Sequence, residues 1–164
     1  ESKVKFVDNV AIMIVPFDRI DKSFLNDFGE KLHEIIGIKY IVSSENIAMG
    51  SPDRQIEQQY DARRLRDVLK EKFNIQQSSP IVGYLGITDK DIFTKNYNFL
   101  FGWAGQGYGV VSCFQFKEGV VIPSNDKFLN TVVKQGVSSS LHILGVKRNP
   151  ADLLSSSACL SRYI

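Results

Sequence analysis

The sequence predicts an α/β domain built on a mixed β-sheet. Segments with the patterns of strands and helices alternate in the order strand, helix, strand, helix. Two or three further strand-like segments and a last helix follow them. A length of 164 residues is typical of one domain with a sizeable core. We therefore expect residues 1–164 to form a single domain.

Two apolar segments near the N-terminus are predicted strands. Residues 9–17, NVAIMIVPF, form a continuous apolar run, which is typical of a buried strand. Residues 38–43, IKYIVS, alternate in polarity and are rich in β-branched side chains. Both segments therefore belong to the predicted sheet.

Residues 21–36, which lie between these strands, have the spacing of an amphipathic helix. Asp21 or Ser23 is suited to the N-cap, and Gly37 is suited to end the helix. His33 and Glu34 form the HE pair with which a helical zinc motif begins, but Gly37 occupies the position of its second histidine. We interpret both side chains as solvated surface.

A second helix is predicted at residues 58–73, QQYDARRLRDVLKEKF. Its outer face carries five Lys or Arg side chains, a pattern more typical of a solvated surface than of a binding site. Residues 81–88, IVGYLGIT, are an apolar strand, and a polar turn is expected at residues 89–91.

The next segment is rich in aromatic residues and glycine. Aromatic side chains concentrate in residues 96–102, and Gly105, Gly107 and Gly109 predict a flexible bend before a final strand at residues 110–116, VVSCFQF. These glycines lack the spacing and the strand-to-helix context of a phosphate-binding loop.

The last helix is predicted within residues 127–148, KFLNTVVKQGVSSSLHILGVKR, after a loop at residues 117–125. Gly145 is suited to end it, because glycine readily adopts the left-handed conformation. The apolar positions fall on one stripe: Leu129, Val132, Val133, Gly136, Val137, Leu141 and Leu144.

This last helix has part of the pattern of a zinc-binding helix. In HExxH two histidines one turn apart bind zinc and the Glu activates its water, and in HExxHxxGxxH a third histidine completes the site. Aligned with that pattern, the chain has Ser138 and Ser139 at the first His and the Glu, keeps His142 and Gly145, and has Arg148 at the third His. The remaining HxxG is a weak signal, and it also fits a helix histidine that binds no metal.

Composition and charge exclude several classes of function. The 20 basic and 18 acidic residues give a net charge of +2, so no nucleic-acid-binding surface is indicated. The longest apolar run, residues 10–17, is too short to cross a bilayer and contains Pro16. No signal peptide is recognisable, although the chain begins at Glu1 rather than Met. We expect no nucleic-acid or membrane partner; the compartment is open, with the cytoplasm slightly favoured, and the oligomeric state is open.

The two cysteines, Cys113 and Cys159, are too few for a four-thiolate zinc site and do not form a CxxC pair. A disulfide between them is one alternative, and a reduced, buried Cys113 beside Phe114 is the more usual one.

Four segments follow one another along the chain: QQYDARRLRDVL at 58–69, LGITDKDIF at 85–93, NFLFGWA at 98–104 and VVSCFQF at 110–116. In this order they resemble the archaemetzincin family of zinc peptidases within the metzincin clan. Lys134 also matches a Lys that this family has four residues before its first zinc-binding histidine. The resemblance covers about residues 8–148 and leaves 149–164 as a short divergent tail. It implies a zincin-like fold: a mixed, mostly parallel twisted sheet with an antiparallel edge strand, packed on two or three long helices.

The resemblance also implies a catalytic zinc, a Met-turn and a second zinc held by four cysteines. Of the zinc helix, only His142 and Gly145 carry over; Ser138, Ser139, Arg148 and Asn149 depart from the family pattern. The tail after residue 148 contains no Met, and its only thiol is Cys159.

These substitutions lead us to interpret the chain as a catalytically inactive relative that needs no cofactor. One imidazole, at His142, cannot replace the three protein ligands of a catalytic zinc, and Arg148 would repel the metal. With Ser139 in place of the Glu, the general base is missing, so we assign no catalytic residue.

Two alternatives remain. The chain could be an active zinc hydrolase that recruits an unusual ligand such as Asp152 or a group from another chain. Ser138 and His142, one helical turn apart, could form a nucleophile pair, but no orienting acid or nucleophile elbow accompanies them.

An inactive relative could still bind an extended peptide. In the metzincin fold an edge strand beside the cleft pairs with the substrate, and the candidate here is the strand containing Val110, Val111, Ser112, Cys113 and Phe114.

Overall fold

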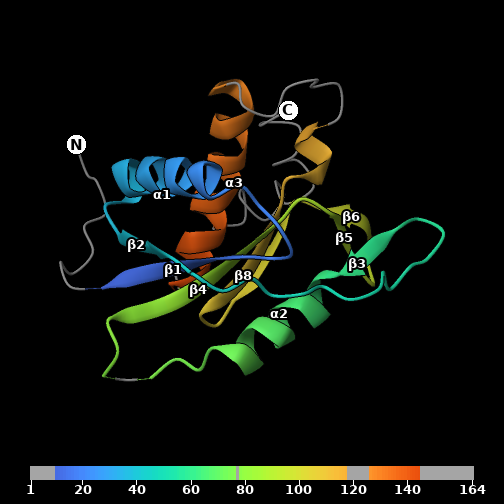
Figure 1. Cartoon of the computed structure of the whole chain (residues 1–164), viewed down its shortest axis with the longest axis horizontal. Helices are drawn as coiled ribbons and strands as arrows, with labels where there is room; N and C mark the ends of the chain where they lie inside the picture. The colour runs from blue at the N-terminus through green and yellow to red at the C-terminus, as the bar shows by residue number, and fades with distance from the viewer. Residues whose placement is uncertain (1–9, 77, 118–125, 145–164) are drawn as a thin grey trace.

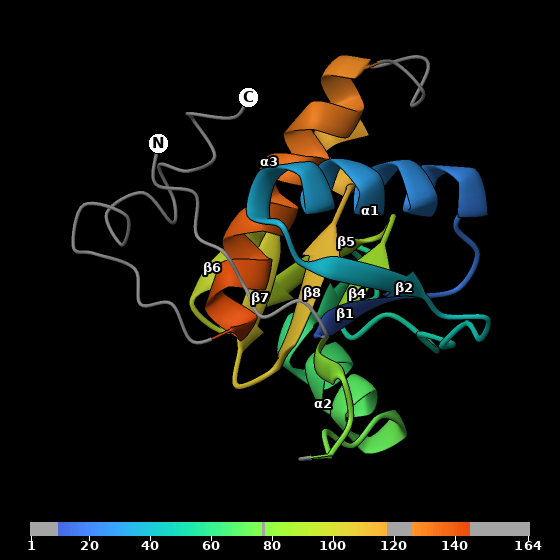
Figure 2. The same ribbon diagram turned by 90° about the vertical axis from the view of Figure 1, so that its left-hand side faces the viewer.

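The protein is a three-layer α/β domain in the computed structural model, which describes residues 10–76, 78–117 and 126–144 (Figure 1). Helices α1 (Lys22–Ile36) and α3 (Asp126–Ile143) cover one face of the sheet, and α2 (Ala62–Lys72) covers the other (Figure 2). None of the described helices is long and apolar enough to cross a membrane.

The central sheet has five strands in the order β2-β1-β4-β8-β7. Its first four strands are parallel to one another, and β7 is an antiparallel edge strand. The predicted mixed, mostly parallel sheet with an antiparallel edge is therefore confirmed. The strands are β1 (Ala11–Pro16), β2 (Lys39–Val42), β4 (Ile81–Thr88), β7 (Gly102–Gly105) and β8 (Tyr108–Ser112).

Two apolar cores lie on the opposite faces of this sheet. Alternate residues of β1 point to different sides, so Ile14 packs with α1 and α3 whereas Val15 packs with α2. Both side chains are fully buried, as the continuous apolar pattern of this strand predicts.

The boundaries of α1 follow from its two caps. The Asp21 side chain accepts a hydrogen bond from the backbone N–H of Ser23, 2.9 Å away, and Gly37 ends the helix with a left-handed φ of 75°. His33 and Glu34 are exposed, as predicted, and His33 Nδ1 lies 2.8 Å from the carbonyl oxygen of Ile38.

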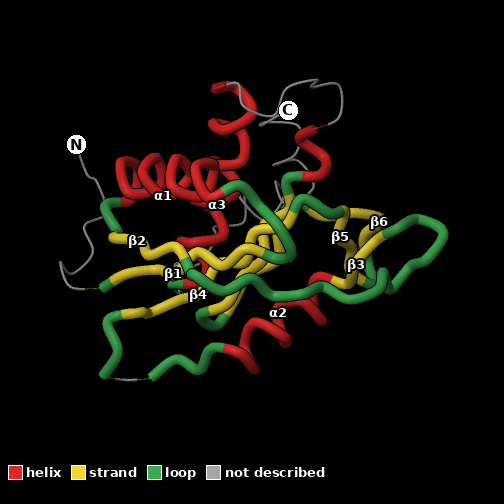
Figure 3. Tube along the Cα trace, in the orientation of Figure 1, coloured by secondary structure: helices red, strands yellow, loops and turns green. Residues whose placement is uncertain are grey.

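A second sheet of three strands was not predicted. It contains β3 (Gln59–Asp61), β5 (Asp91–Thr94) and β6 (Tyr97–Leu100), in that order, and a long loop connects β2 to β3 (Figure 3). The prediction that a helix begins at residue 58 is wrong, because the Asp61 side chain caps α2 by accepting from the N–H of Arg63, 2.9 Å away. Residues 59–61 instead pair in parallel with β5.

The final strand is shorter than predicted. It ends at Ser112, and a 3₁₀ turn occupies Phe114–Lys117. The Ser112 hydroxyl donates to the carbonyl of Lys90, 2.6 Å away, and accepts from the N–H of Phe114, 3.1 Å away, which holds the chain as it leaves the sheet. The predicted glycine bend is the β7–β8 hairpin turn, with φ of 55° at Gln106 and 89° at Gly107.

The predicted stripe of α3 packs between α1 and the sheet. Leu129, Val132 and Val133 are buried in the core with α1. A Cβ on Gly136 would lie 2.3 Å from Phe28 Cζ, so a glycine is needed where α1 and α3 approach. Gly145 lies outside the described residues.

Candidate functional site

The candidate site lies where the last two turns of α3 pass the edge strand β7. Both elements are needed to form it, since α3 supplies Ser138, Ser139 and His142 and β7 supplies a short, glycine-rich edge. Ser139 is 1% exposed, whereas Ser138 and His142 are half-buried.

Ser139, which the sequence comparison with the zinc motif predicted to stand at the general-base position, contacts neighbours in the protein. Gln135, one turn earlier in α3, has its Nε2 3.3 Å from Ser139 Oγ and donates a hydrogen bond to it. A Cβ on Gly102 of β7 would lie 3.0 Å from that hydroxyl and 2.6 Å from the Gln135 nitrogen. The hydroxyl and the amide therefore fill the space that Gly102 leaves between helix and sheet.

His142 lies at the other end of the same contact. A Cβ on Gly105 would be 3.9 Å from its Nε2 and 3.8 Å from its Cδ2, so the imidazole lies against the last residue of β7. The Gly105 carbonyl oxygen accepts hydrogen bonds from the guanidinium of Arg66, at 3.2 Å from Nε and 2.8 Å from Nη2. Helix α2 thus fixes the end of the strand that His142 contacts.

Ser140, next to Ser139, belongs to the core and not to the site. It is fully buried, and its hydroxyl has no hydrogen-bond partner among the described residues. Ser140 lies four residues after Gly136 and so shares the helix face that packs on Phe28.

The described side chains do not fit a catalytic zinc. Within residues 10–76, 78–117 and 126–144, no three His, Cys, Asp or Glu residues are grouped to hold a metal. His142 supplies one imidazole and Ser139 a hydroxyl that is engaged with Gln135, whereas a catalytic zinc usually has three protein ligands. Arg148, Asn149, Asp152 and Cys159 lie outside the described residues.

The predicted peptide-binding edge strand is wrong in position. Val110, Val111 and Ser112 belong to β8, which pairs with β4 on one side and β7 on the other. Cys113 is buried, and the half-exposed Phe114 belongs to the 3₁₀ turn. A strand with two neighbours has no free backbone edge for a peptide, so the edge near α3 is that of β7.

The register shows which groups β7 presents at that edge. Phe101, directly before β7, accepts a hydrogen bond from the N–H of Ser112. Trp103 and Gly105 lie two and four residues further on, so they also direct their backbone groups toward β8. Bonds in an antiparallel pair alternate, so the N–H and C=O groups of Gly102 and Ala104 point away from β8. Two residues of β7 therefore direct backbone donors and acceptors outward.

Sequence reasoning missed Gln135 and Gly102 as members of this site. Gln135 is four residues before Ser139, which places both side chains on one helix face, and this spacing was a usable signal. Nothing in the sequence near Gly102 indicated that it lies against α3.

Comparisons with known proteins support the family resemblance, although no protein-family model matches the chain. An archaemetzincin of Saccharolobus islandicus is 25% identical over 140 residues, which are 84% of this chain and 74% of that protein. An archaemetzincin of Archaeoglobus fulgidus is 37% identical over 70 residues, 42% of this chain and 41% of that protein.

Solved structures show the same likeness. The chain matches archaemetzincin from Methanopyrus kandleri with a TM-score of 0.64 and 26% identity, covering 86% of this chain and 76% of that one. For the malonate complex of the Archaeoglobus fulgidus protein the TM-score is 0.66 at 23% identity, covering 86% and 82%. A zinc-dependent peptidase from Methanocorpusculum labreanum has a TM-score of 0.66 at 18% identity, covering 85% and 83%. This chain is therefore a homologue of the archaemetzincins and has their metallopeptidase fold.

Proposed function

We propose that this protein binds an extended peptide beside β7 without hydrolysing it. The observation that carries the proposal is the environment of Ser139, at the position of the family's general base. Its hydroxyl is buried and hydrogen-bonded to Gln135. A serine hydroxyl cannot replace a carboxylate as the base that activates water at neutral pH.

The metal ligands support the same proposal. Ser138 stands where the family has its first histidine, and a neutral hydroxyl binds zinc poorly compared with imidazole. Arg148 stands at the third histidine, and a cation there opposes a divalent metal. His142 alone retains a family ligand type.

Zinc content and peptidase activity test the absence of catalysis. Protein prepared without chelator is analysed for zinc, then supplied with zinc and assayed on a mixture of unstructured peptides. His142→Ala and His33→Ala form a matched pair, because the chain has two histidines and His33 is exposed on α1. We expect no stoichiometric zinc and no cleavage in any of the three proteins. Zinc-dependent cleavage that is lost in His142→Ala but not in His33→Ala would refute the proposal.

A zinc hydrolase with an unusual ligand set is the second candidate, and the retained His142 beside β7 favours it. Asp152 or a group from another chain would then have to complete the site. Near-stoichiometric zinc and zinc-dependent peptide cleavage that are both lost in His142→Ala and in Asp152→Asn would establish this alternative with Asp152 as a ligand.

The outer edge of β7, which pairs with no further strand among the described residues, supports peptide binding by strand addition. An added strand would exchange hydrogen bonds with the outward groups of Gly102 and Ala104, as edge strands do with extended ligands. The edge is short, so two residues supply most of the backbone bonds.

The N–H of Ala104 provides a specific test of this mode. Ala104→Pro removes that donor, and proline is tolerated on an edge strand where its nitrogen faces outward. Ala104→Ser is the matched control, because it keeps the N–H and changes the volume little. A peptide selected from a random library on the wild-type protein should bind Ala104→Ser normally and Ala104→Pro at least about tenfold more weakly, since more than one bond is disturbed. Equal binding to both folded variants would exclude strand addition at β7.

A further inference from the structure

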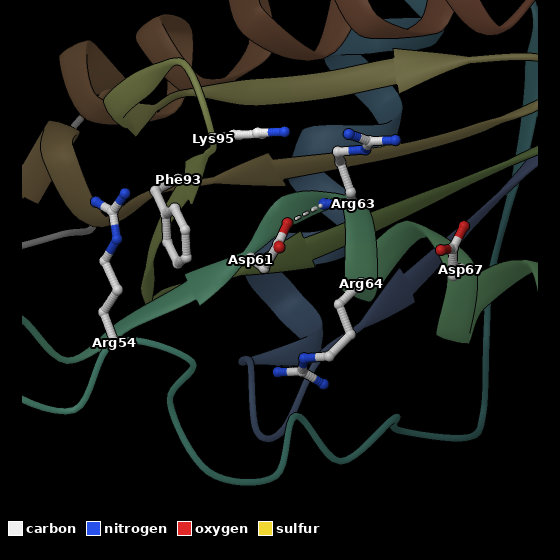
Figure 4. A pocket seen from close by; sticks show the side chains of 7 residues that line it. All are labelled: Arg54, Asp61, Arg63, Arg64, Asp67, Phe93 and Lys95. Atoms are coloured by element: carbon white, nitrogen blue, oxygen red, sulfur yellow. Dashed lines mark hydrogen bonds between the residues drawn. The ribbon is translucent and has the colours of Figure 1, made fainter.

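A charged pocket at the start of α2 is separate from the contact between α3 and β7. Its volume is about 610 Å³, and it is formed by the loop before β3, by the first two turns of α2 and by β5 with its following turn (Figure 4). Its lining side chains are Arg54, Asp61, Arg63, Arg64, Asp67, Phe93 and Lys95.

Arg54 is held in one orientation by neutral groups. Its guanidinium carbon lies 3.8 Å from the centroid of the Phe93 ring, and its Nη1 donates to Gln59 Oε1, 3.1 Å away. The Gln59 amide is fixed in turn, because its Nε2 donates to Asp91 Oδ2 at 2.8 Å and to the Asn98 carbonyl oxygen at 2.7 Å. Among the residues that the structure describes, Arg54 is therefore positioned without a carboxylate partner.

Two of the other charged lining residues, Arg64 and Asp61, stabilise the fold. Arg64 forms an ion pair with Asp53, 2.9 Å away, and extends away from Arg63 and Lys95 in Figure 4. The Asp61 carboxylate caps α2 by accepting from the backbone N–H of Arg63, the bond drawn in that figure. Neither group is directed to a ligand.

Arg63 and Lys95 are in a different situation. Both are exposed, and in the part of the chain that the structure describes neither forms an ion pair. Together with Arg54 they give three positive charges against the carboxylates of Asp61 and Asp67. The N-terminus of α2 adds a partial positive charge at the same place.

We propose that this pocket binds an oxyanion, a carboxylate or a phosphoryl group, at Arg63 and Lys95, whose charged ends lie on the same side of the Phe93 ring (Figure 4). Arg63 and Lys95 supply hydrogen-bond donors and charge to such a group, and Arg54, held on the other side of the Phe93 ring, adds to the positive potential of the pocket. Because α2 covers the sheet face opposite α3, this site does not depend on zinc, on hydrolysis or on peptide binding at β7.

Titration with small anions tests the proposal. Inorganic phosphate and glutarate are added separately to the full chain at constant ionic strength, and the backbone amide shifts of Ala62 and Arg63 are followed by NMR. Saturable shifts of these amides are expected with at least one anion. Phosphate alone, glutarate alone or both would identify a phosphoryl site, a carboxylate site or a general oxyanion site, and each result supports the proposal.

Charge variants show whether the pocket itself is responsible. Arg63→Gln and Lys95→Gln should each weaken binding about three- to fivefold, the effect of one exposed charge contact. Asp67→Asn should tighten it. Lys70→Gln is the matched control, because Lys70 is an exposed cation on α2 outside the pocket, and it should leave the affinity unchanged. Shifts that do not saturate, or an equal loss in Lys70→Gln, would overturn the proposal.

Discussion

Two adjacent serines of α3 should respond oppositely to the same substitution. Ser139 and Ser140 are 1% and 0% exposed, so Ser→Ala removes a buried hydroxyl in each case. The Ser139 hydroxyl accepts from Gln135 Nε2, whereas the Ser140 hydroxyl has no partner among the described residues. The two substitutions have the same helix propensity change and differ in this bond.

The magnitude follows from that difference. Ser139→Ala loses one neutral hydrogen bond, which should lower the free energy of unfolding by about 1 kcal/mol. Ser140→Ala removes a buried polar group without a bond, so stability should stay the same or rise by up to about 1 kcal/mol. For a chain of 164 residues, 1 kcal/mol corresponds to a change in Tm of about 2–4 °C.

Urea unfolding of both variants and the wild type measures these changes at equilibrium. A double-mutant cycle with Gln135→Met should recover a coupling of about 1 kcal/mol for Ser139 and none for Ser140. Equal destabilisation by Ser139→Ala and Ser140→Ala would refute the reasoning that Ser139 serves packing against β7 through its bond to Gln135.

Three further substitutions test other parts of the fold. Gly136→Ala should destabilise the protein by about 1–3 kcal/mol in thermal unfolding, because the new Cβ would lie 2.3 Å from Phe28. This loss is expected despite the higher helix propensity of Ala, and stabilisation would contradict the close contact between α1 and α3. Gly37→Ala has open space around its Cβ but a φ of 75°, so a loss of about 1 kcal/mol is expected from backbone strain alone, and no loss would show that the helix end adapts. Burial raises the pKa of Asp53, but hydrogen bonds from Arg64 and from backbone N–H groups outweigh it and leave the pKa below its ordinary value of 3.8. Its contribution is thus present above about pH 4 and lost as the pH falls below that value, so Asp53→Asn should lower stability at pH 7 and flatten the acid limb of the stability curve; an unchanged acid limb would exclude this role.

Local patterns were sufficient for the elements whose ends are determined by neighbours in sequence. Helix α1 is capped by Asp21, one of the two N-caps predicted, and by Gly37, the predicted stop, because an N-cap and a left-handed stop act within one turn. Strands β1 and β4 were equally clear, since both of their faces are buried and both are continuously apolar.

Helical periodicity placed the start of α2 at residue 58, too early, because the spacing of apolar residues does not show where a helix is capped. Gln59 and Tyr60 continue the amphipathic pattern of α2, yet they pair with β5, a strand whose first residue was expected in a turn. The pairing joins segments about thirty residues apart, and its buried bond from Gln59 to Asp91 exists only after the chain has folded.

By itself the sequence determined the α/β class and the succession of the main helices and strands, because each of these depends on residue identity at short spacing. Only the tertiary structure decided that β7 and not β8 is the outer strand of the sheet formed by the described residues. It also decided that Ser139 is engaged with Gln135 beside Gly102, and that Arg54, Arg63 and Lys95 line one pocket. Strand order and side-chain neighbours across a sheet arise from long-range packing, which no local pattern encodes.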